Sequence, residues 1–570
     1  MGKKSRKKNT QETVLTSTVA GVEAIKISSL ALLAVLVAVC LTPFLGKAFH
    51  IDDALFVWAA RQIAQHPSDP YGFTVNWYTA PQPMWEVTQN PPLSSYYMAG
   101  IARLWGWSEP ALHAGFLLVA LAAILGTYAL ARRLTRWPLL AAAATLAAPG
   151  FLVSSTTLMC DTMMLALWIF AILFWLDGLE RKRPVLLAIS ALLIAVCALT
   201  KYFGVALIPL LLVYSMVRTR RIDSSLLYLL LPVAALAGYQ SWTGALYGKG
   251  LLGGAAQYAQ AFNSASFYKV LVGLSFAGGC ALPALTFAPL IWSRRMILLA
   301  AAAAGGACFL VGIGVIGMPA GPAQDHRHIV SAQMALFVAG GIGALALAVS
   351  DWRRRGDADS LLLLLWIVGT WLFSWCVNWS VNARSVLPMV PAVGILLARR
   401  LELGGAPAGK LQMARLIVPL ALSGGVSLWV TWADASLANS SRMAAQYARD
   451  RLSTPGSKVS FEGHWGFQYY MQAYGFQPVD FRNFIAAKGD IIIIPENNTS
   501  AAVQTIPAAA VISKETFAFP IKTGATTMDQ SGGSGFYSDV WGPMPYAFGP
   551  AYSEVYNVLR VRNPSEASPK

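Results

Sequence analysis

Long apolar runs separated by short polar segments fill the chain from about Ile27 to Trp432. A membrane span needs roughly 17–25 mainly apolar residues, and runs of this kind predict about thirteen transmembrane helices. The pattern is typical of a polytopic α-helical membrane protein. We expect the spans at Ile27–Gly46, Ala111–Ala131, Trp137–Thr156, Thr162–Leu179, Pro184–Thr200, Phe203–Val217, Ser225–Trp242, Val270–Trp292, Met296–Met318, Ile329–Ser350, Ser360–Val377, Ser385–Ala398 and Leu411–Trp432.

Clusters of basic residues precede the first span and follow every second span after it. Because cytoplasmic loops carry an excess of Lys and Arg, this alternation predicts a cytoplasmic N-terminus. An odd number of spans then puts the C-terminus outside. We expect a multi-pass protein of the inner (plasma) membrane with a basic cytoplasmic tail (1–26), a transmembrane domain (27–432) whose first outer loop is 47–110, and an extracytoplasmic soluble domain (433–570).

The composition agrees with membrane insertion. Of the 570 residues, 56% are hydrophobic and 12% are charged, against about 25% charged in ordinary globular proteins. The net charge of +16 comes from the membrane part and gathers in the predicted cytoplasmic loops, so we expect no nucleic acid partner. The six cysteines lie in apolar stretches without a Cys-x-x-Cys pair, which favours buried thiols over disulfides or a zinc site.

The predicted soluble domain begins with a recognisable alternation of elements. A strand at Lys458–Glu462 is followed by a helix at Trp465–Tyr474 and by a buried apolar strand at Gly489–Pro495. These elements predict a small α/β domain. Its later part, 532–549, is rich in glycine and aromatic residues and is typical of loops and short strands.

The first outer loop predicts two amphipathic helices at the membrane surface. Apolar residues recur at helical spacing in Ile51–Ile63, and a second such segment follows Asn90. Many aromatic residues decorate this loop. Interfacial anchoring explains most of them, and a sugar-stacking role remains open for one or two. They are Trp58, Trp77, Tyr78, Trp85, Tyr96, Tyr97, Trp105 and Trp107.

Acidic and basic residues meet at the outer ends of the predicted spans. Asp52 follows the first span, and Asp161 begins the fourth. Lys201 follows the fifth span, and Arg384 precedes the twelfth. Each also has an ordinary explanation, because an Asp at a helix start often caps the helix and a Lys near a span end can snorkel. However, ionisable residues that border spans indicate function, and these four share one membrane depth.

Such a group suits transfer from a phosphorylated lipid. A carboxylate can deprotonate an acceptor hydroxyl, and cations can hold a phosphate leaving group. No phosphate-binding glycine loop occurs in the cytoplasmic parts. We therefore expect no cofactor beyond a lipid-linked sugar phosphate substrate, although a divalent metal stays open. For His326 and His328, a solvated loop is favoured over a metal site.

These residues resemble the C-type glycosyltransferase superfamily. The similarity is greatest to glycosyltransferase family 39, which includes the protein O-mannosyltransferases, and to its relative, the lipid A aminoarabinose transferase. The matching motifs keep the order and topology of the family between about residues 25 and 400. They are Asp52-Asp53, Pro91-Pro92-Leu93, Asp161, Thr200-Lys201, and Arg384 with Leu387-Pro388-Met389-Val390-Pro391.

The resemblance implies a glycosyltransferase of the cell envelope, a hexosyl- or pentosyltransferase that uses a polyprenyl-phosphate sugar donor among the membrane lipids and inverts the sugar. It implies Asp52 and Asp161 as catalytic residues. The expected substrate-binding residues are Asp53, Asn90, Lys201 and Arg384. Asn90 stands where the family often has Lys or His. A lipid or sugar transporter or flippase is the alternative function, and a non-catalytic scaffold is a third.

Overall fold

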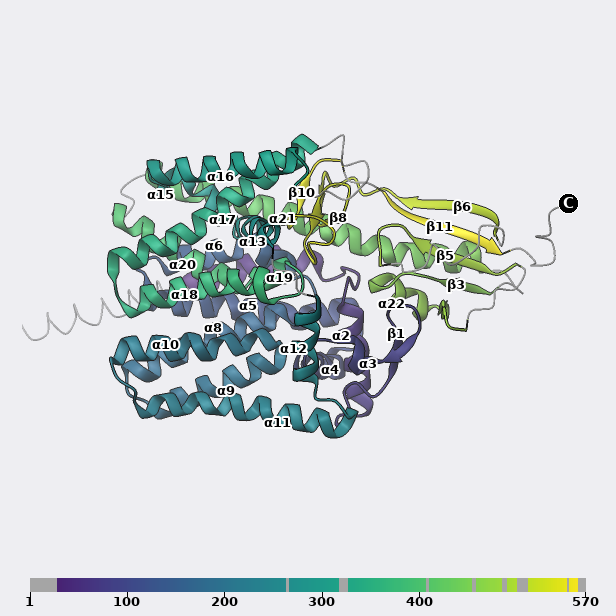
Figure 1. Ribbon diagram of the computed structural model, residues 1–570, viewed down its shortest axis with the longest axis horizontal. Coiled ribbons are helices and arrows are strands. Elements are labelled where there is room, and N and C mark those ends of the chain that lie inside the picture. The colour runs from purple at the N-terminus through teal and green to yellow at the C-terminus, as the bar shows by residue number, and fades with distance from the viewer. Residues whose placement is uncertain are drawn as a thin grey trace, which may run out of the picture.

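A computed structural model describes residues 28–262, 266–316, 327–405, 410–453, 458–483, 489–499, 511–550 and 553–561. Long helices lie side by side along the long axis of the molecule, and a sheet lies beyond one end of them (Figure 1). Within the described ranges, eight helices are long and apolar enough to cross a membrane. They are Glu109–Leu134 (α5), Asp161–Glu180 (α8), Tyr202–Thr219 (containing α10, Leu207–Thr219), Ser224–Tyr247 (containing α11, Leu230–Tyr247), Arg294–Gly312 (α16), Arg327–Arg355 (α17), Ala358–Val377 (containing α18, Ala358–Leu372) and Lys410–Leu452 (containing α21, Lys410–Tyr447).

Shorter apolar helices coincide with three of the five remaining predicted spans. Ser28–Phe44, Pro184–Thr200 (α9) and Phe267–Cys280 (α13) are such helices. The membrane character of the chain is thus confirmed, while the number of thirteen spans stays a prediction.

Three predicted spans are interrupted helices. Each break lies within a few residues of a proline, which lacks the N–H that continues a helix and restricts the residue before it. The pieces are α6 (Pro138–Leu146) and α7 (Pro149–Ser154); α13, α14 (Pro283–Thr286) and α15 (Ala288–Ile291); and α19 (Ala383–Val386) and α20 (Met389–Leu401).

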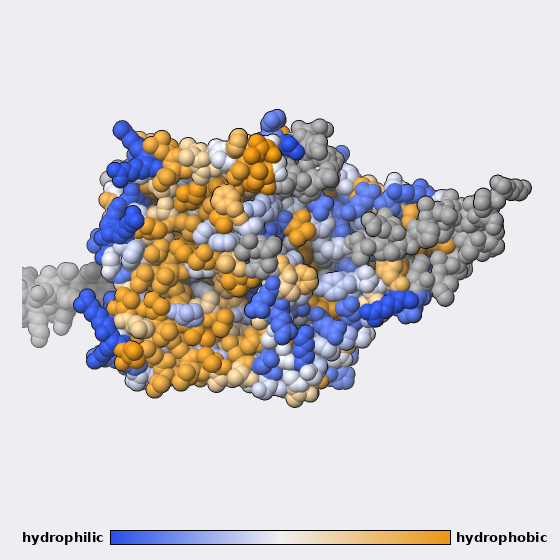
Figure 2. All heavy atoms as spheres, in the orientation of Figure 1, coloured by the Kyte–Doolittle hydropathy of each residue, from blue (hydrophilic) through white to orange (hydrophobic). Residues whose placement is uncertain are grey.

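The surface separates into zones along the long axis. On the face drawn in Figure 2, a hydrophobic belt covers the helices, with hydrophilic residues at both of its ends. One end, which we call the basic end, holds ion pairs such as Arg133–Asp177 and Arg355–Glu402. The other, which we call the domain end, adjoins the C-terminal domain (Figure 1). This zoning is what a bilayer-spanning bundle requires.

The first loop folds into short elements at the domain end. They are α2 (Asp53–Gln65), the hairpin β1 (Thr74–Asn76) and β2 (Pro81–Pro83), α3 (Met84–Val87) and α4 (Leu93–Trp105). The two predicted helices of this loop are present as α2 and α4, and a further helix, α12 (Leu251–Phe262), lies at the same end.

Interfacial anchoring does not account for every aromatic residue of this loop. Trp77 is 8% exposed, and its ring stacks on His464 of the C-terminal domain at 5.3 Å. Trp58 packs against Trp77 and Tyr469. These two tryptophans therefore join α2 to the C-terminal domain, whereas Trp105 remains half exposed.

The C-terminal domain is built on a mixed sheet of five strands in the order β4-β3-β5-β11-β6. The strands are β3 (Val459–Phe461), β4 (Gln477–Pro478), β5 (Ile491–Pro495), β6 (Val511–Phe519) and β11 (Glu554–Val561), and α22 (Trp465–Ala473) lies between β3 and β4. The parallel part, β4-β3-β5, contains the predicted strand, helix and strand. The prediction of a small α/β domain is confirmed.

The segment between β6 and β11 forms only two-residue strands, as its composition predicts. They are β7 (Ala525–Thr526), β8 (Met528–Asp529), β9 (Ser534–Gly535) and β10 (Ala547–Phe548). This segment packs on the membrane helices: the Tyr546 hydroxyl donates to Gly279 O, and the indole of Trp429 donates to Thr523 O. In addition, α21 continues past the predicted boundary at Ala433 to Tyr447, so one helix belongs to both parts.

Candidate functional site

Asp52 stands at the start of α2, after a tight bend. Ile51 adopts φ +47°, a conformation that is rare for a β-branched residue and is found where surrounding structure enforces it. Asp52 occupies the N-cap position but makes no side-chain capping hydrogen bond. Instead, its Oδ2 pairs with Arg384 Nη1 of α19 at 3.2 Å. The capping explanation therefore does not hold for Asp52.

A second ion pair joins α8 to the end of α9. Asp161 is the first residue of α8 and is 1% exposed. Lys201 Nζ donates to its Oδ1, so Lys201 is paired rather than snorkelling freely. The other oxygen, Oδ2, is buried and makes no hydrogen bond within the part of the chain that the structure describes. This leaves an acceptor position beside a cation.

The two ion pairs lie next to each other. Arg384 Nη1 is 2.7 Å from Met159 Sδ, two residues before Asp161. Cys160 Sγ lies 3.7 Å from Asn90 Oδ1. The structure thus brings Asp52, Asp161, Arg384 and Lys201 together at the domain end, with Asn90 beside them. Arg384 Nε is buried and makes no hydrogen bond among the described residues, so the guanidinium keeps a donor for a further partner.

Asp53 differs from its neighbour. It is fully buried, and its two oxygens accept from the backbone amides of His50 (2.9 Å) and Leu158 (2.8 Å). Burial raises the pKa of the Asp53 carboxyl to about 7, although Lys47 and the amides oppose this shift. With both oxygens engaged, Asp53 ties the start of α2 to the loop before α8. We expect it to hold Asp52 in place rather than to touch a substrate.

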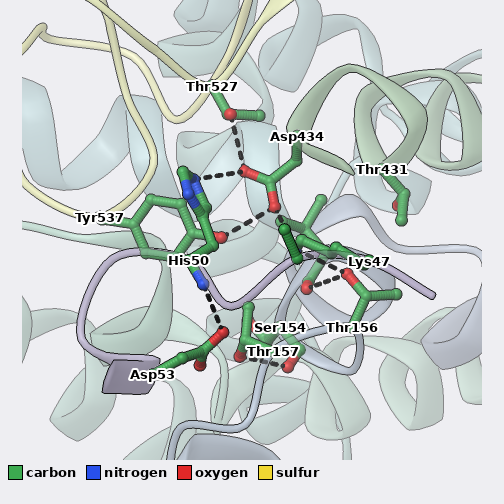
Figure 3. Close-up of polar contacts among 12 residues, drawn as sticks. Lys47, His50, Asp53, Ser154, Thr156, Thr157, Thr431, Asp434, Thr527 and Tyr537 are labelled. Atoms are coloured by element: carbon green, nitrogen blue, oxygen red, sulfur yellow. Dashed lines mark hydrogen bonds and ion pairs between the residues drawn. The ribbon is translucent and has the colours of Figure 1, made fainter. Parts of the chain in front are cut away.

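A buried polar cluster that the sequence analysis did not single out is centred on Asp434 (Figure 3). Lys47 Nζ is 2.5 Å from Asp434 Oδ2, and both side chains are fully buried. Asp434 also accepts from Thr527 Oγ1 at 2.7 Å and from the Tyr537 hydroxyl at 2.9 Å. The available signal was weak: Lys47 looked like one more outer-loop cation, and Asp434 fell just beyond the last predicted span.

Metal binding finds no support in the described residues. Among them, no group of three or more His, Cys, Asp or Glu side chains is arranged to hold a metal ion. His328 lies near the start of α17, and His326 lies outside the described residues. The candidate site itself combines two carboxylates, Asp52 and Asp161, with two cations, Lys201 and Arg384.

Comparison with solved structures gives weak similarities to membrane glycosyltransferases. The oligosaccharyltransferase of Archaeoglobus fulgidus is 15% identical over 80% of this chain and 64% of its own length, with a TM-score of 0.46. ArnT from Cupriavidus metallidurans, bound to undecaprenyl phosphate, is 16% identical over 83% of this chain and 93% of its own, with a TM-score of 0.44. The arabinofuranosyltransferase AftD from Mycobacteria is 14% identical over 94% and 40%, with a TM-score of 0.39.

Sequence comparison is more specific. No curated protein sequence matches the chain. Residues 89–242, however, match the family described as dolichyl-phosphate-mannose-protein mannosyltransferase. This stretch contains Asn90, Asp161 and Lys201, whereas Asp52 and Arg384 lie outside it. Over residues 89–242 the resemblance predicted from the motifs is confirmed.

Proposed function

We propose that this protein transfers a sugar from a polyprenyl-phosphate-linked donor to an acceptor hydroxyl at the outer face of the membrane, with inversion. One observation carries the proposal: the ion pairs Asp52–Arg384 and Asp161–Lys201 lie together at one end of the bundle. Their residues come from four separate segments of the chain. Charges that border membrane spans are costly and are kept where they serve substrates.

Asp52 suits the role of the base. Its side chain is 28% exposed, so a hydroxyl can approach within the roughly 3 Å that proton transfer needs. The acceptor proton passes to the carboxylate as the acceptor oxygen attacks the anomeric carbon from the side opposite the phosphate. The bond from that carbon to the phosphate oxygen breaks, and its electron pair leaves with the polyprenyl phosphate. Attack from the opposite side inverts the configuration.

Arg384 and Lys201 suit the role of holding the phosphate. A guanidinium can bind phosphate through two parallel hydrogen bonds, and an ammonium adds a point charge. Both cations are partly exposed, at 15% and 18% of their side-chain surface. Asp161 orients Lys201, and its unbonded oxygen can accept a hydrogen bond from a substrate hydroxyl. Undecaprenyl phosphate, the ligand named for the similar ArnT structure, is a suitable probe.

The outer face is favoured because the domain end lies opposite the basic end. Arg133 and Arg355 close helices α5 and α17 at the basic end. Loops rich in Lys and Arg stay in the cytoplasm, and a site at the other end then opens to the extracytoplasmic side. Lipid-linked sugars need no nucleotide there. A reporter fused after Ser436 tests this orientation, since activity restricted to the cytoplasm would contradict it.

The decisive experiment compares adjacent acids. A strain that lacks the protein should accumulate its polyprenyl-phosphosugar, and the lipid extract of that strain supplies the donor. Membranes with matched protein levels then report the release of polyprenyl phosphate. We expect Asp52→Asn, which keeps the shape but not the basicity, to lower the transfer rate about 10²–10⁴-fold. Asp53→Asn should be much milder, because Asp53 binds backbone amides.

Other outcomes have clear meanings. If Asp53→Asn is inactive and Asp52→Asn is active, the two roles are exchanged. If both variants are active, Asp52 is not the base. Movement of the intact donor across vesicle membranes without release of polyprenyl phosphate would instead identify a transporter.

A further inference from the structure

The C-terminal domain borders the candidate site directly. Ala383 N donates to Phe536 O at 2.8 Å, next to Arg384. Asp539 N donates to Val381 O at 2.8 Å, and its carboxylate accepts from Val381 N at 3.0 Å. The chain that leads into Arg384 is therefore hydrogen-bonded to the segment 536–539. This contact fixes the backbone from which the guanidinium extends.

Tyr537 contacts both segments of the chain that carry the Asp52–Arg384 pair. Its ring meets His50, two residues before Asp52, edge to face at 5.3 Å. The Arg384 guanidinium carbon lies 5.7 Å from the centre of the same ring. Tyr537 is 3% exposed, so its ring is shielded from water. Cation–π contacts are strongest when water is excluded from them. One side chain of the C-terminal domain thus touches both loops that carry the pair.

The Tyr537 hydroxyl is anchored in turn by Asp434 (Figure 3). It donates to Asp434 Oδ2 at 2.9 Å, and the same oxygen binds Lys47 Nζ at 2.5 Å. Lys47 begins the segment that reaches Asp52 five residues later. Thr527 donates to the other oxygen of Asp434 at 2.7 Å. Buried side chains held by several hydrogen bonds in this way are rigid.

We infer that Tyr537 is a positioning residue that holds Arg384 in the orientation needed to bind a lipid phosphate, so that the C-terminal domain completes the site. The inference rests on the proposed function of Arg384. Asp52 and Met159 both contact Nη1 of the guanidinium, whereas Nε makes no hydrogen bond among the described residues. The Tyr537 ring supplies a flat, buried support on which the guanidinium is held before a ligand arrives.

The test measures the affinity of undecaprenyl phosphate for the full chain in nanodiscs. The variants are Tyr537→Leu, Arg384→Ala and the double variant. We expect Tyr537→Leu to weaken binding about tenfold. In the Arg384→Ala background the same substitution should change affinity less than twofold, since the residue that Tyr537 positions is gone. Tyr537→Phe, which keeps the ring, should restore affinity to within about threefold of the wild type.

Thr527→Val is the matched control, because it removes the other neutral hydrogen bond to Asp434 and leaves the ring in place. Its affinity should equal that of the wild type, and thermal unfolding of every variant separates lost folding from lost binding. If Tyr537→Leu does not fold, Tyr537→Met replaces it in the same comparison.

Three results would overturn the inference. Equal losses for Tyr537→Leu in both backgrounds would show a general structural effect. An Arg384→Ala variant that binds undecaprenyl phosphate normally would overturn the phosphate role of Arg384 itself. A loss on Arg384→Ala with none on Tyr537→Leu would reject only the positioning role.

Discussion

The Lys47–Asp434 cluster and the candidate site are two groups of charged residues that differ in how completely they are paired. In the Lys47–Asp434 cluster both side chains are 0% exposed. Lys47 also donates to Thr156 at 3.2 Å, and both oxygens of Asp434 accept hydrogen bonds. In the candidate site, Asp161 Oδ2 and Arg384 Nε have no hydrogen-bond partner among the described residues.

The difference separates charged residues that stabilise the fold from charged residues that serve a substrate. A buried ion pair is tolerated only when its remaining hydrogen-bonding positions are satisfied, and Lys47 and Asp434 find such partners in Thr156, Thr527 and Tyr537. The candidate site does not, and its cations are partly open to solvent. Atoms left unpaired at such a cost indicate that a substrate supplies the missing partners.

The largest effect on folding should come from removing one partner of the Lys47–Asp434 pair. Lys47→Met leaves Asp434 as an uncompensated buried charge, which costs about 3–5 kcal/mol of unfolding free energy. Chemical unfolding in detergent micelles measures this loss. The double variant Lys47→Met/Asp434→Leu should recover most of it, since an apolar pair can replace a buried ion pair. A loss below about 1 kcal/mol for Lys47→Met would show that the cluster does not stabilise the fold.

The pH dependence of stability tests whether Asp53 is a neutral, buried part of the framework. Its pKa is raised from 3.8 to about 7, chiefly by burial. The folded state therefore keeps this proton where the unfolded chain has lost it, and stability falls as the pH rises from about 4 to about 7. Asp53→Asn stays neutral throughout, so its stability relative to the wild type should rise over that window by at most about 1.4 kcal/mol per pH unit.

Thermal unfolding of both proteins between pH 4 and 8 measures the difference. A flat difference across the window would mean that Asp53 is ionised in the folded protein at all these pH values. Asp53 would then belong with the charged site rather than with the buried framework.

The sequence predicts the architecture well because the physics of membrane spans is local. Every predicted span coincides with helix, since about twenty apolar residues need no distant partner to form one. The interruptions near Pro149 and Pro388 were missed because hydropathy does not register the lost N–H of a proline. The strand, helix and strand of the C-terminal domain were found from periodicity and a run of isoleucines.

The site was predictable only in part. Asp52, Asp161, Lys201 and Arg384 stand out because each is a charge beside an apolar run, and topology puts them at one depth. Their pairing depends on how helices pack, which no local pattern encodes. Asp434 and Tyr537 were missed for the same reason: Asp434 meets Lys47 across 387 residues of chain, and a tyrosine in an aromatic-rich loop carries no signal of its own.

Arg384→Lys tests the Asp52–Arg384 pair without removing its positive charge. Lys keeps the attraction to Asp52, so the stability of the fold should change by no more than about 1 kcal/mol. It cannot form two parallel hydrogen bonds to phosphate, and binding of undecaprenyl phosphate should weaken about tenfold. Affinity measured in nanodiscs, with thermal unfolding as the control, checks both statements. Unchanged affinity would mean that Arg384 acts only as a point charge.

The smallest effect should come from Asn90, at the edge of the site. Its backbone oxygen accepts from the Tyr71 hydroxyl at 2.8 Å, and this bond survives any side-chain substitution. Within the described part of the chain, its side-chain oxygen accepts only from the weak thiol donor of Cys160, at 3.7 Å, so it remains available to a substrate. Asn90→Ala should therefore leave stability within about 0.5 kcal/mol of the wild type. It should lower the transfer rate about three- to tenfold, the worth of one hydrogen bond. Gln89→Ala is the matched control, because that side chain donates to Glu86 O in the neighbouring turn and contacts none of the four charged site residues. If both variants transfer at the wild-type rate, Asn90 does not bind the substrate and has only a structural role.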